Sequence, residues 1–265
     1  MEEKKHKKKI TICGYTLYYL AGYFTIYSVI GFILETIFGA IANGVIESRK
    51  SFLYGPFCAI YGVGAIAMLL PLKYCKKNFK TLFIGGALLG SIVEYAVSLF
   101  GEMIYHVKWW DYSDMPLNLN GRICIYFTVV WGILAVLFMQ YIHPSVERLV
   151  KKATSRIKKN TLKIIVLALF VFQFIDFWVS TLAVEMFTSR KIHELNLDVE
   201  NRQVTEQKYE FLYSSDYIKQ LSKTVFNDNV MLKAFPNLKI QYKDGRVIYF
   251  KELMPEVIPY YIKFK

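Results

Sequence analysis

Long apolar runs separated by short connections fill residues 17–187 of the chain. A helix needs about 20 residues to cross a hydrocarbon core about 30 Å thick. The runs therefore predict five membrane-spanning helices, near residues 17–42, 55–72, 82–104, 122–143 and 162–187. The second run opens with Tyr54-Gly55-Pro56 and contains Gly62 and Gly64. It is expected to begin as a re-entrant or broken segment, which a membrane tolerates only where protein or a wet cavity covers the backbone.

From about residue 188 the apolar runs give way to polar stretches with charges of both signs and recurring Tyr and Phe. The turn signal Lys243-Asp244-Gly245-Arg246 lies between residues 238–242 and 247–250, and this arrangement predicts a hairpin. Such a composition suits a small folded unit better than a disordered tail. The sequence therefore predicts an all-α polytopic membrane domain over residues 1–187 and an α+β C-terminal appendage over residues 188–265.

Basic residues gather in the connections that would lie on one side of the membrane. Five lysines precede the first run, four follow the second, and seven Lys or Arg lie between residues 148 and 163 after the fourth. Because basic connections stay in the cytoplasm, the N-terminus is expected on the cytoplasmic side of the cell membrane and the appendage on the opposite, extracytoplasmic side. This placement accounts for much of the net charge of +12 without a nucleic-acid-binding face. Membrane lipids, not nucleic acid, are the expected partners.

Glu35 lies inside the first apolar run, and Glu94 lies near the middle of the third. An ionised side chain at the bilayer centre costs about 3 kcal/mol or more, so such a group usually faces a protein interior and has a task. Both are candidate acid–base groups of a polar chamber in the outer half of the bilayer. The substrate-binding candidates predicted on the same side are Tyr54, Glu102, Trp110, Asp111, Asn120 and Arg122.

A structural interpretation stays open for the same acids. Glu35 and Glu94 lie in stripes of small residues at four-residue spacing, which is typical of helix packing. Either acid could pair with Arg122 as a lock between helices. Asp176 and Glu185 in the fifth run form a second rank of candidates.

The sequence predicts no metal site and no cofactor. The four cysteines form no CxxC pair, so neither a zinc site nor a disulfide framework is indicated. The chain also lacks the phosphate-binding pattern G-x-x-x-x-G-K-S/T. ATP chemistry would therefore require a separate ATPase subunit.

Several motifs follow one another in a fixed order: Leu53-Tyr54-Gly55-Pro56-Phe57, Glu94-Tyr95, Trp109-Trp110-Asp111-Tyr112-Ser113 and Asn118-Leu119-Asn120-Gly121-Arg122. Over about residues 20–150 the chain resembles the CmpB-like permeases of the ABC-transporter type IV family. It departs from them at Ala59, where the family usually has Pro, and at Lys50-Ser51, where an Arg-Gly pair is usual. The resemblance implies a bacterial multi-pass membrane protein.

Three functions are compatible with these patterns. The first is a permease, alone or as a homodimer with a separate ATPase, that handles a small or lipid-like anionic substrate. The second is an intramembrane enzyme acting on a lipid or lipid-linked substrate, with Glu35 or Glu94 as acid–base group and Arg122 as anion clamp. The third is a structural or regulatory membrane protein, in which the glutamates hold helices together.

Overall fold

The computed structural model describes residues 11–75, 78–105, 110–200, 202–257 and 262–263. Within these residues, four helical stretches are long and apolar enough to span a membrane. They are α1 (Leu17–Asn43), α3 (Phe79–Tyr105), the stretch from α4 (Ile125–Leu137) to α5 (His143–Thr154), and α6 (Lys159–Glu194). A shorter apolar helix, α2 (Ala59–Leu72), packs against α1 and α3. The mostly helical membrane fold with about five spanning segments is thereby confirmed.

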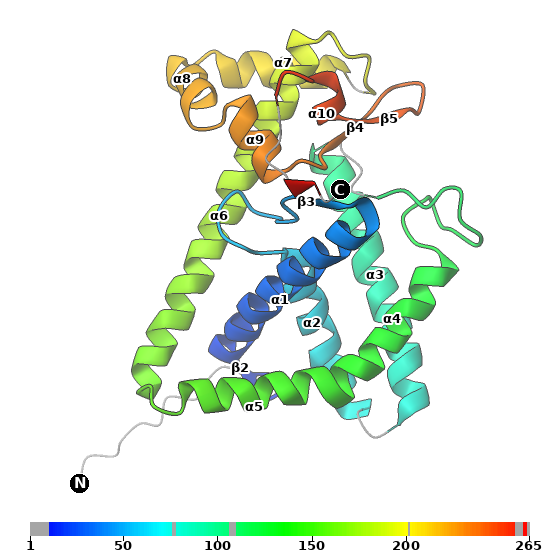
Figure 1. The fold of residues 1–265 in the computed structure, drawn as a ribbon, viewed down its shortest axis with the longest axis vertical. Coiled ribbons are helices and arrows are strands. Elements are labelled where there is room, and N and C mark those ends of the chain that lie inside the picture. Colours follow the sequence, from blue (N-terminus) through cyan, green and yellow to red (C-terminus); the bar gives the residue numbers. More distant parts are fainter. Residues whose placement is uncertain (1–10, 76–77, 106–109, 201, 258–261, 264–265) are drawn as a thin grey trace.

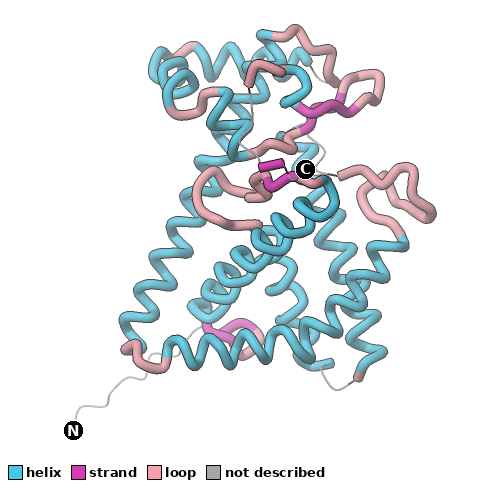
Figure 2. Tube along the Cα trace, in the orientation of Figure 1, coloured by secondary structure: helices cyan, strands magenta, loops and turns pink. Residues whose placement is uncertain are grey.

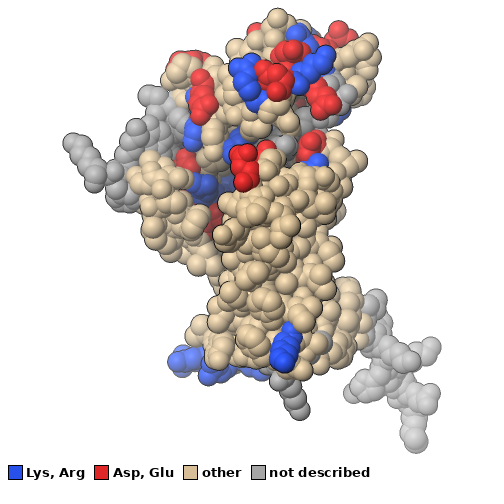
Figure 3. All heavy atoms as spheres, turned by 90° about the vertical axis from the view of Figure 1, so that its right-hand side faces the viewer, with Lys and Arg blue, Asp and Glu red and all other residues tan. Residues whose placement is uncertain are grey.

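An apolar waist separates two charged ends of the molecule. On the face shown in Figure 3, Lys and Arg mark the end that carries α5, whereas side chains of both signs mark the opposite end. Large apolar side chains stay exposed on the spanning helices; Phe38 on α1 and Phe174 on α6 are 69% and 58% exposed. Lipid covers such a surface in a membrane. We call the two ends the basic end and the appendage end.

The second segment enters the membrane part as a non-helical loop, as the Gly-Pro pair at its start predicts. Residues 47–58 lack helical structure, and α2 begins only at Ala59. The backbone amide of Cys58 donates to the carbonyl oxygen of Ser28 on α1 at 2.8 Å. The loop therefore packs against α1, and at least part of its backbone is hydrogen-bonded to protein.

Small residues bring α3 and α4 close together, in agreement with the four-residue spacing. A Cβ added at Gly86 would overlap the side chain of Ala135, and one added at Gly90 would overlap the ring of Trp131. Only glycine fits these two positions without movement of α4.

The C-terminal appendage is a small α+β unit (Figure 2). It comprises α7 (Arg202–Tyr213), α8 (Asp216–Thr224), α9 (Asp228–Ala234), the strands β4 (Lys239–Gln241) and β5 (Val247–Tyr249), and α10 (Phe250–Leu253). β4 and β5 pair antiparallel with Ile240 opposite Ile248, which confirms the predicted hairpin. The remaining short elements are β1 (Thr11–Ile12) paired with β2 (Tyr15–Thr16), β3 (Val45–Ile46) paired with β6 (Ile262–Lys263), and the 3₁₀ turn η1 (Lys73–Cys75).

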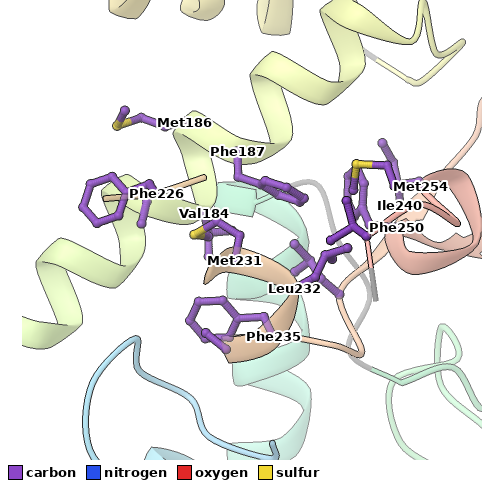
Figure 4. Close-up of a cluster of buried hydrophobic side chains, with 14 of the residues drawn as sticks. Val184, Met186, Phe187, Phe226, Met231, Leu232, Phe235, Ile240, Phe250 and Met254 are labelled. Carbon is purple, nitrogen blue, oxygen red and sulfur yellow. The ribbon is translucent and has the colours of Figure 1, made fainter. Parts of the chain in front are cut away.

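The core of the appendage is built onto the end of α6 (Figure 4). α6 continues without a break across residue 187, where the membrane domain is predicted to end. Phe187 of α6 lies in one buried cluster with Met231 and Leu232 of α9 and Phe250 of α10. The rings of Phe187 and Phe250 meet edge to face, with their centroids 5.2 Å apart. One helix therefore serves both as a membrane span and as a support for the appendage.

Candidate functional site

A cavity of about 490 Å³ lies where the spanning helices meet the C-terminal appendage. Its walls come from α1, α3 and α6, the start of α2, residues 48–52 of the loop, and residues 235–238 after α9. Most of the wall is apolar, with side chains such as Val63, Val97 and Phe177. Small-molecule sites typically occupy about 300–1,000 Å³ and combine apolar walls with a few polar groups. We call this space the interface cavity.

Glu35 is the predicted acid–base candidate that lines the interface cavity. Its carboxylate is half-buried, and Oε1 accepts a hydrogen bond of 2.7 Å from the hydroxyl of Tyr61 on α2. The ion pairs among the described residues do not include Glu35. Glu35 thus offers the cavity a carboxylate that can accept a hydrogen bond or a proton.

Two basic residues of the loop line the same cavity, Arg49 and Lys50. Arg49 Nη2 lies 3.0 Å from Oε1 of the buried Glu47, while Arg49 Nε is buried and has no hydrogen-bond partner among the described residues. A Cβ at Gly39 would come within 2.8 Å of the Arg49 guanidinium, so the glycine of α1 makes room for it. Lys50 Nζ donates to the carbonyl oxygen of Leu53 at 2.6 Å.

Lys50 is half-buried, so its ammonium group is only partly solvated. Lys50 also borders a second cavity of about 410 Å³, on which Lys233, Gly55 and Pro56 lie as well. A partly desolvated cation of this kind gains from an anionic partner.

Arg49 and Lys50 are not among the site residues predicted from the sequence. They stand in the short polar connection after the first apolar run, next to the motif Leu53-Tyr54-Gly55-Pro56-Phe57. Two adjacent basic residues directly before a broken membrane segment are the sequence pattern that could have indicated their place at the site.

Glu94 lies apart from the interface cavity and is almost fully buried, with 6% exposure. The hydroxyl of Tyr112 donates to Oε1 at 3.0 Å, and the indole nitrogen of Trp131 on α4 donates to Oε2 at 2.9 Å. Burial, followed by the nearby Glu94 carboxylate, raises the pKa of the Tyr112 hydroxyl in the loop before α4. Both oxygens of Glu94 therefore hold α3 against α4 and the preceding loop.

Arg122 pairs with an acid other than those considered for a lock. Its Nη1 lies 2.5 Å from Glu102 Oε2 and donates to Ser98 Oγ at 3.3 Å. The guanidinium carbon lies 5.8 Å from the centre of the Tyr95 ring, within the range of cation–π attraction. Arg122, Glu102, Ser98 and Tyr95 thus form one cluster at the appendage end of α3.

The remaining predicted residues surround this cluster or the loop. Trp110 lines the interface cavity and donates from its indole nitrogen to the carbonyl oxygen of Arg122 at 2.9 Å. Asn120 donates to the hydroxyl of Tyr95 at 2.8 Å. Asp111 accepts from the amide and the hydroxyl of Ser113, which closes a local turn. Trp109, which belongs to the same motif, lies outside the described residues.

Tyr54 and Asp176 meet through the backbone. The amide of Tyr54 donates to both carboxylate oxygens of Asp176 on α6, at 3.2 Å each, while the Tyr54 side chain is 46% exposed. Ser180, one turn further along α6, accepts from the amide of Leu53 at 2.7 Å. The other second-rank acid, Glu185, pairs with Lys208 of α7 at 2.8 Å. These two acids hold the loop and the appendage to α6.

The predicted chamber residues thus do not form a single chamber in the structure. Glu35 and Trp110 line the interface cavity, Glu94 binds Tyr112 and Trp131, and Arg122 binds Glu102. Residues 235–238 of the appendage also line the cavity, and sequence spacing does not reveal this contribution.

Comparison with known proteins points to one family. Its sequence model, described as putative ABC-transporter type IV, matches residues 22–181, which is more than half of the chain. Neither the curated proteins nor the solved structures contain a match. The matched stretch includes α2, α3, α4 and α5, together with most of α1 and α6. The chain therefore belongs to the family of putative ABC-transporter type IV membrane proteins.

Proposed function

We propose that the chain is the membrane subunit of an ABC-type transporter and that the interface cavity holds its substrate. Membership of the family and the apolar spanning helices support a transporter-type membrane protein. The observation that carries the rest of the proposal is the cavity itself. It is large enough for a small ligand, has mostly apolar walls, and has Arg49 and Lys50 on one side.

The substrate class follows from these walls. Each CH₂ group that leaves water for an apolar wall gains about 0.8 kcal/mol. A hydrogen bond to a charged group adds about 1.5–3 kcal/mol. An anionic amphiphile would gain both, with its head group near Arg49 and Lys50 and its apolar part beside Val63, Val97 and Phe177.

The orientation follows from the charges of the two ends. The basic end carries α5 and faces the cytoplasm in our proposal. The N-terminus then lies on the cytoplasmic side of the cell membrane, and the appendage lies on the extracytoplasmic side. The interface cavity then lies in the outer half of the bilayer. A separate ATPase subunit would have to meet the basic end, and a homodimer of the chain is compatible with this arrangement.

The acids have different roles in this proposal. Glu35 borders the cavity and is the residue that would exchange a proton or accept a hydrogen bond from the substrate. Glu94 has both oxygens occupied by Tyr112 and Trp131, and we assign it to helix packing. An enzymatic role at the cavity would therefore rest on Glu35.

Native mass spectrometry of the purified protein tests the site. We expect a co-purified anionic amphiphile on the wild type and its loss in Arg49→Gln/Lys50→Gln. Lys219→Gln, an exposed change on α8, should retain it. Val97→Phe, which fills the cavity, should also lose the ligand, whereas Ile92→Phe on the exposed face of α3 should not. Retention of the same ligand by every variant would show that it binds elsewhere.

A further inference from the structure

The chain changes direction at the end of α4. A π-helical turn, η2 (Phe138–Ile142), follows α4, and α5 then crosses the basic end of the molecule toward the start of α6 (Figure 1). The buried His143 fixes this bend, because its Nδ1 lies 2.8 Å from the hydroxyl of Tyr27 on α1 and is hydrogen-bonded to it. Of the apolar stretch from α4 to α5, only α4 and η2 therefore run along the spanning direction, whereas α5 lies across the ends of the spanning helices (Figure 1).

The two faces of α5 differ sharply in character. Val146, Leu149, Val150 and Ala153 recur at the spacing of one helix face. Val146 packs against the buried core of the membrane part, so this apolar face points toward the spanning helices. Leu149 lies on the same face and is nevertheless 65% exposed, because the described part of the chain leaves it uncovered.

The opposite face is basic. Arg148, Lys151 and Lys152 are exposed, and the basic residues 156, 158 and 159 continue the charge toward α6. Lys151 pairs with Glu147 at 2.9 Å, whereas Arg148 bonds within its own helix to Ser145 and Pro144. A strong positive excess therefore remains on this side.

We propose that α5 is an interfacial helix that lies on the membrane surface and binds anionic phospholipid head groups. A large apolar–polar division, basic residues on the polar face and a position in the plane of the membrane surface are the features of such helices. Leu149 would enter the acyl boundary, and the basic face would meet the head groups. Each basic residue near an anionic leaflet strengthens the association about fivefold.

An acidic protein partner would complement the basic face of α5 but not its apolar face. It would neutralise Arg148 and Lys152 but would leave Leu149 without apolar cover, because Leu149 lies on the side of the spanning helices. An anionic bilayer covers both faces at once, and it already surrounds the adjacent spans. The inference concerns the basic end and does not depend on the ligand of the interface cavity.

Hydrogen exchange of α5 in lipid nanodiscs tests the proposal with the full chain. We expect slower amide exchange in phosphatidylcholine with added phosphatidylglycerol than in phosphatidylcholine alone. The variant R148Q/K151Q/K152Q should lose this difference. The matched triple K219Q/K223Q/R246Q, which removes the same charge from the exposed surface of the appendage, should keep it.

A second measurement guards against misfolding of the triple variant. In the wild type, added salt should reduce the protection that phosphatidylglycerol provides, because exposed charges are screened. Exchange rates in α5 that are equal in the two lipids, or a lipid-dependent difference that survives both salt and charge removal, would overturn the proposal. Protection that develops only when a cytosolic protein is added would overturn it as well.

Discussion

The backbone amide of Tyr54 lies 3.2 Å from each carboxylate oxygen of Asp176, so a non-helical loop is fixed to the middle of the last spanning helix. Ser180 completes the attachment, because its hydroxyl accepts from the amide of Leu53 at 2.7 Å and donates to Asp176 at 3.1 Å. A backbone N–H without a partner costs several kcal/mol inside a membrane. These two side chains of α6 therefore provide hydrogen-bond acceptors for the backbone of the loop that lines the interface cavity.

Replacement of Asp176 should show how much this attachment contributes. Asp176→Ala leaves the amide of Tyr54 without its acceptor, and we expect a loss of about 2–4 kcal/mol in the free energy of unfolding. Asp176→Asn retains one acceptor oxygen and should lose less. Thermal melting of the purified protein in detergent checks the order wild type, Asn, Ala. Equal melting temperatures for the wild type and Asp176→Ala would refute the role of this contact.

Glu94 should behave as a packing residue. Glu94→Gln cannot accept from both Tyr112 and Trp131, so we expect a lower yield of folded protein. The folded fraction should still retain the ligand of the interface cavity. The double variant Glu94→Gln/Trp131→Phe should lose less stability than the sum of the losses in the two single variants, because both changes disrupt the same hydrogen bond between Glu94 and Trp131. Normal folded yield with complete loss of function would instead support a catalytic Glu94.

A pair of glycines provides a matched test of helix packing. Gly86→Ala places a methyl group against Ala135 of α4, and overpacking of this kind costs about 1–3 kcal/mol. Gly64→Ala in α2 meets no atom within 4 Å and should be neutral or stabilising, because alanine favours helix formation. Melting temperatures of the two variants decide the matter. A Gly86→Ala variant as stable as Gly64→Ala would contradict the close contact of α3 and α4.

Acid should weaken the junction between α6 and the appendage. A hydrogen bond from His193 Nδ1, 2.6 Å away, is the main cause that lowers the pKa of the Glu206 carboxyl below its usual 4.5, and Arg202 contributes. The stabilisation is therefore complete above the unfolded pKa of about 4.5 and is lost as the pH falls through the lower folded pKa.

Hydrogen exchange of α7 measured across this acidic range checks the effect. Glu206→Gln should remove part of the acid sensitivity of α7. Glu210→Gln, an exposed change on the same helix, should leave it unaltered. Identical acid sensitivity in the wild type and Glu206→Gln would speak against a stabilising His193–Glu206 contact.

Local patterns in the sequence predict much of the fold. The apolar runs predict the spans, the Gly55-Pro56 pair predicts the broken entry of α2, and Lys243-Asp244-Gly245-Arg246 predicts the hairpin. Each of these features depends on residues that are neighbours in the chain. The small-residue stripe around Gly90 likewise indicates a packing surface, although not its partner.

Contacts between distant parts of the chain are less accessible from the sequence. Glu94 and Trp131 are 37 residues apart, and Tyr54 and Asp176 are 122 apart, so no local spacing pairs them. The contribution of residues 235–238 to the wall of the interface cavity likewise depends on contact between distant parts of the chain. α5 is different, because the spacing of Val146, Leu149 and Val150 already indicates an amphipathic helix within what we interpreted as a basic connection.

The central claim is that this chain works as the membrane subunit of an ABC-type transporter, and its assembly state in native membranes tests that claim most directly. Cross-linking before solubilisation, followed by affinity purification and native mass spectrometry, gives the subunits and their ratio. We expect a stoichiometric ATPase subunit cross-linked to the basic end of the chain. A chain recovered alone, or only with lipid, would contradict the transporter assignment and leave a lipid-binding protein or enzyme centred on Glu35.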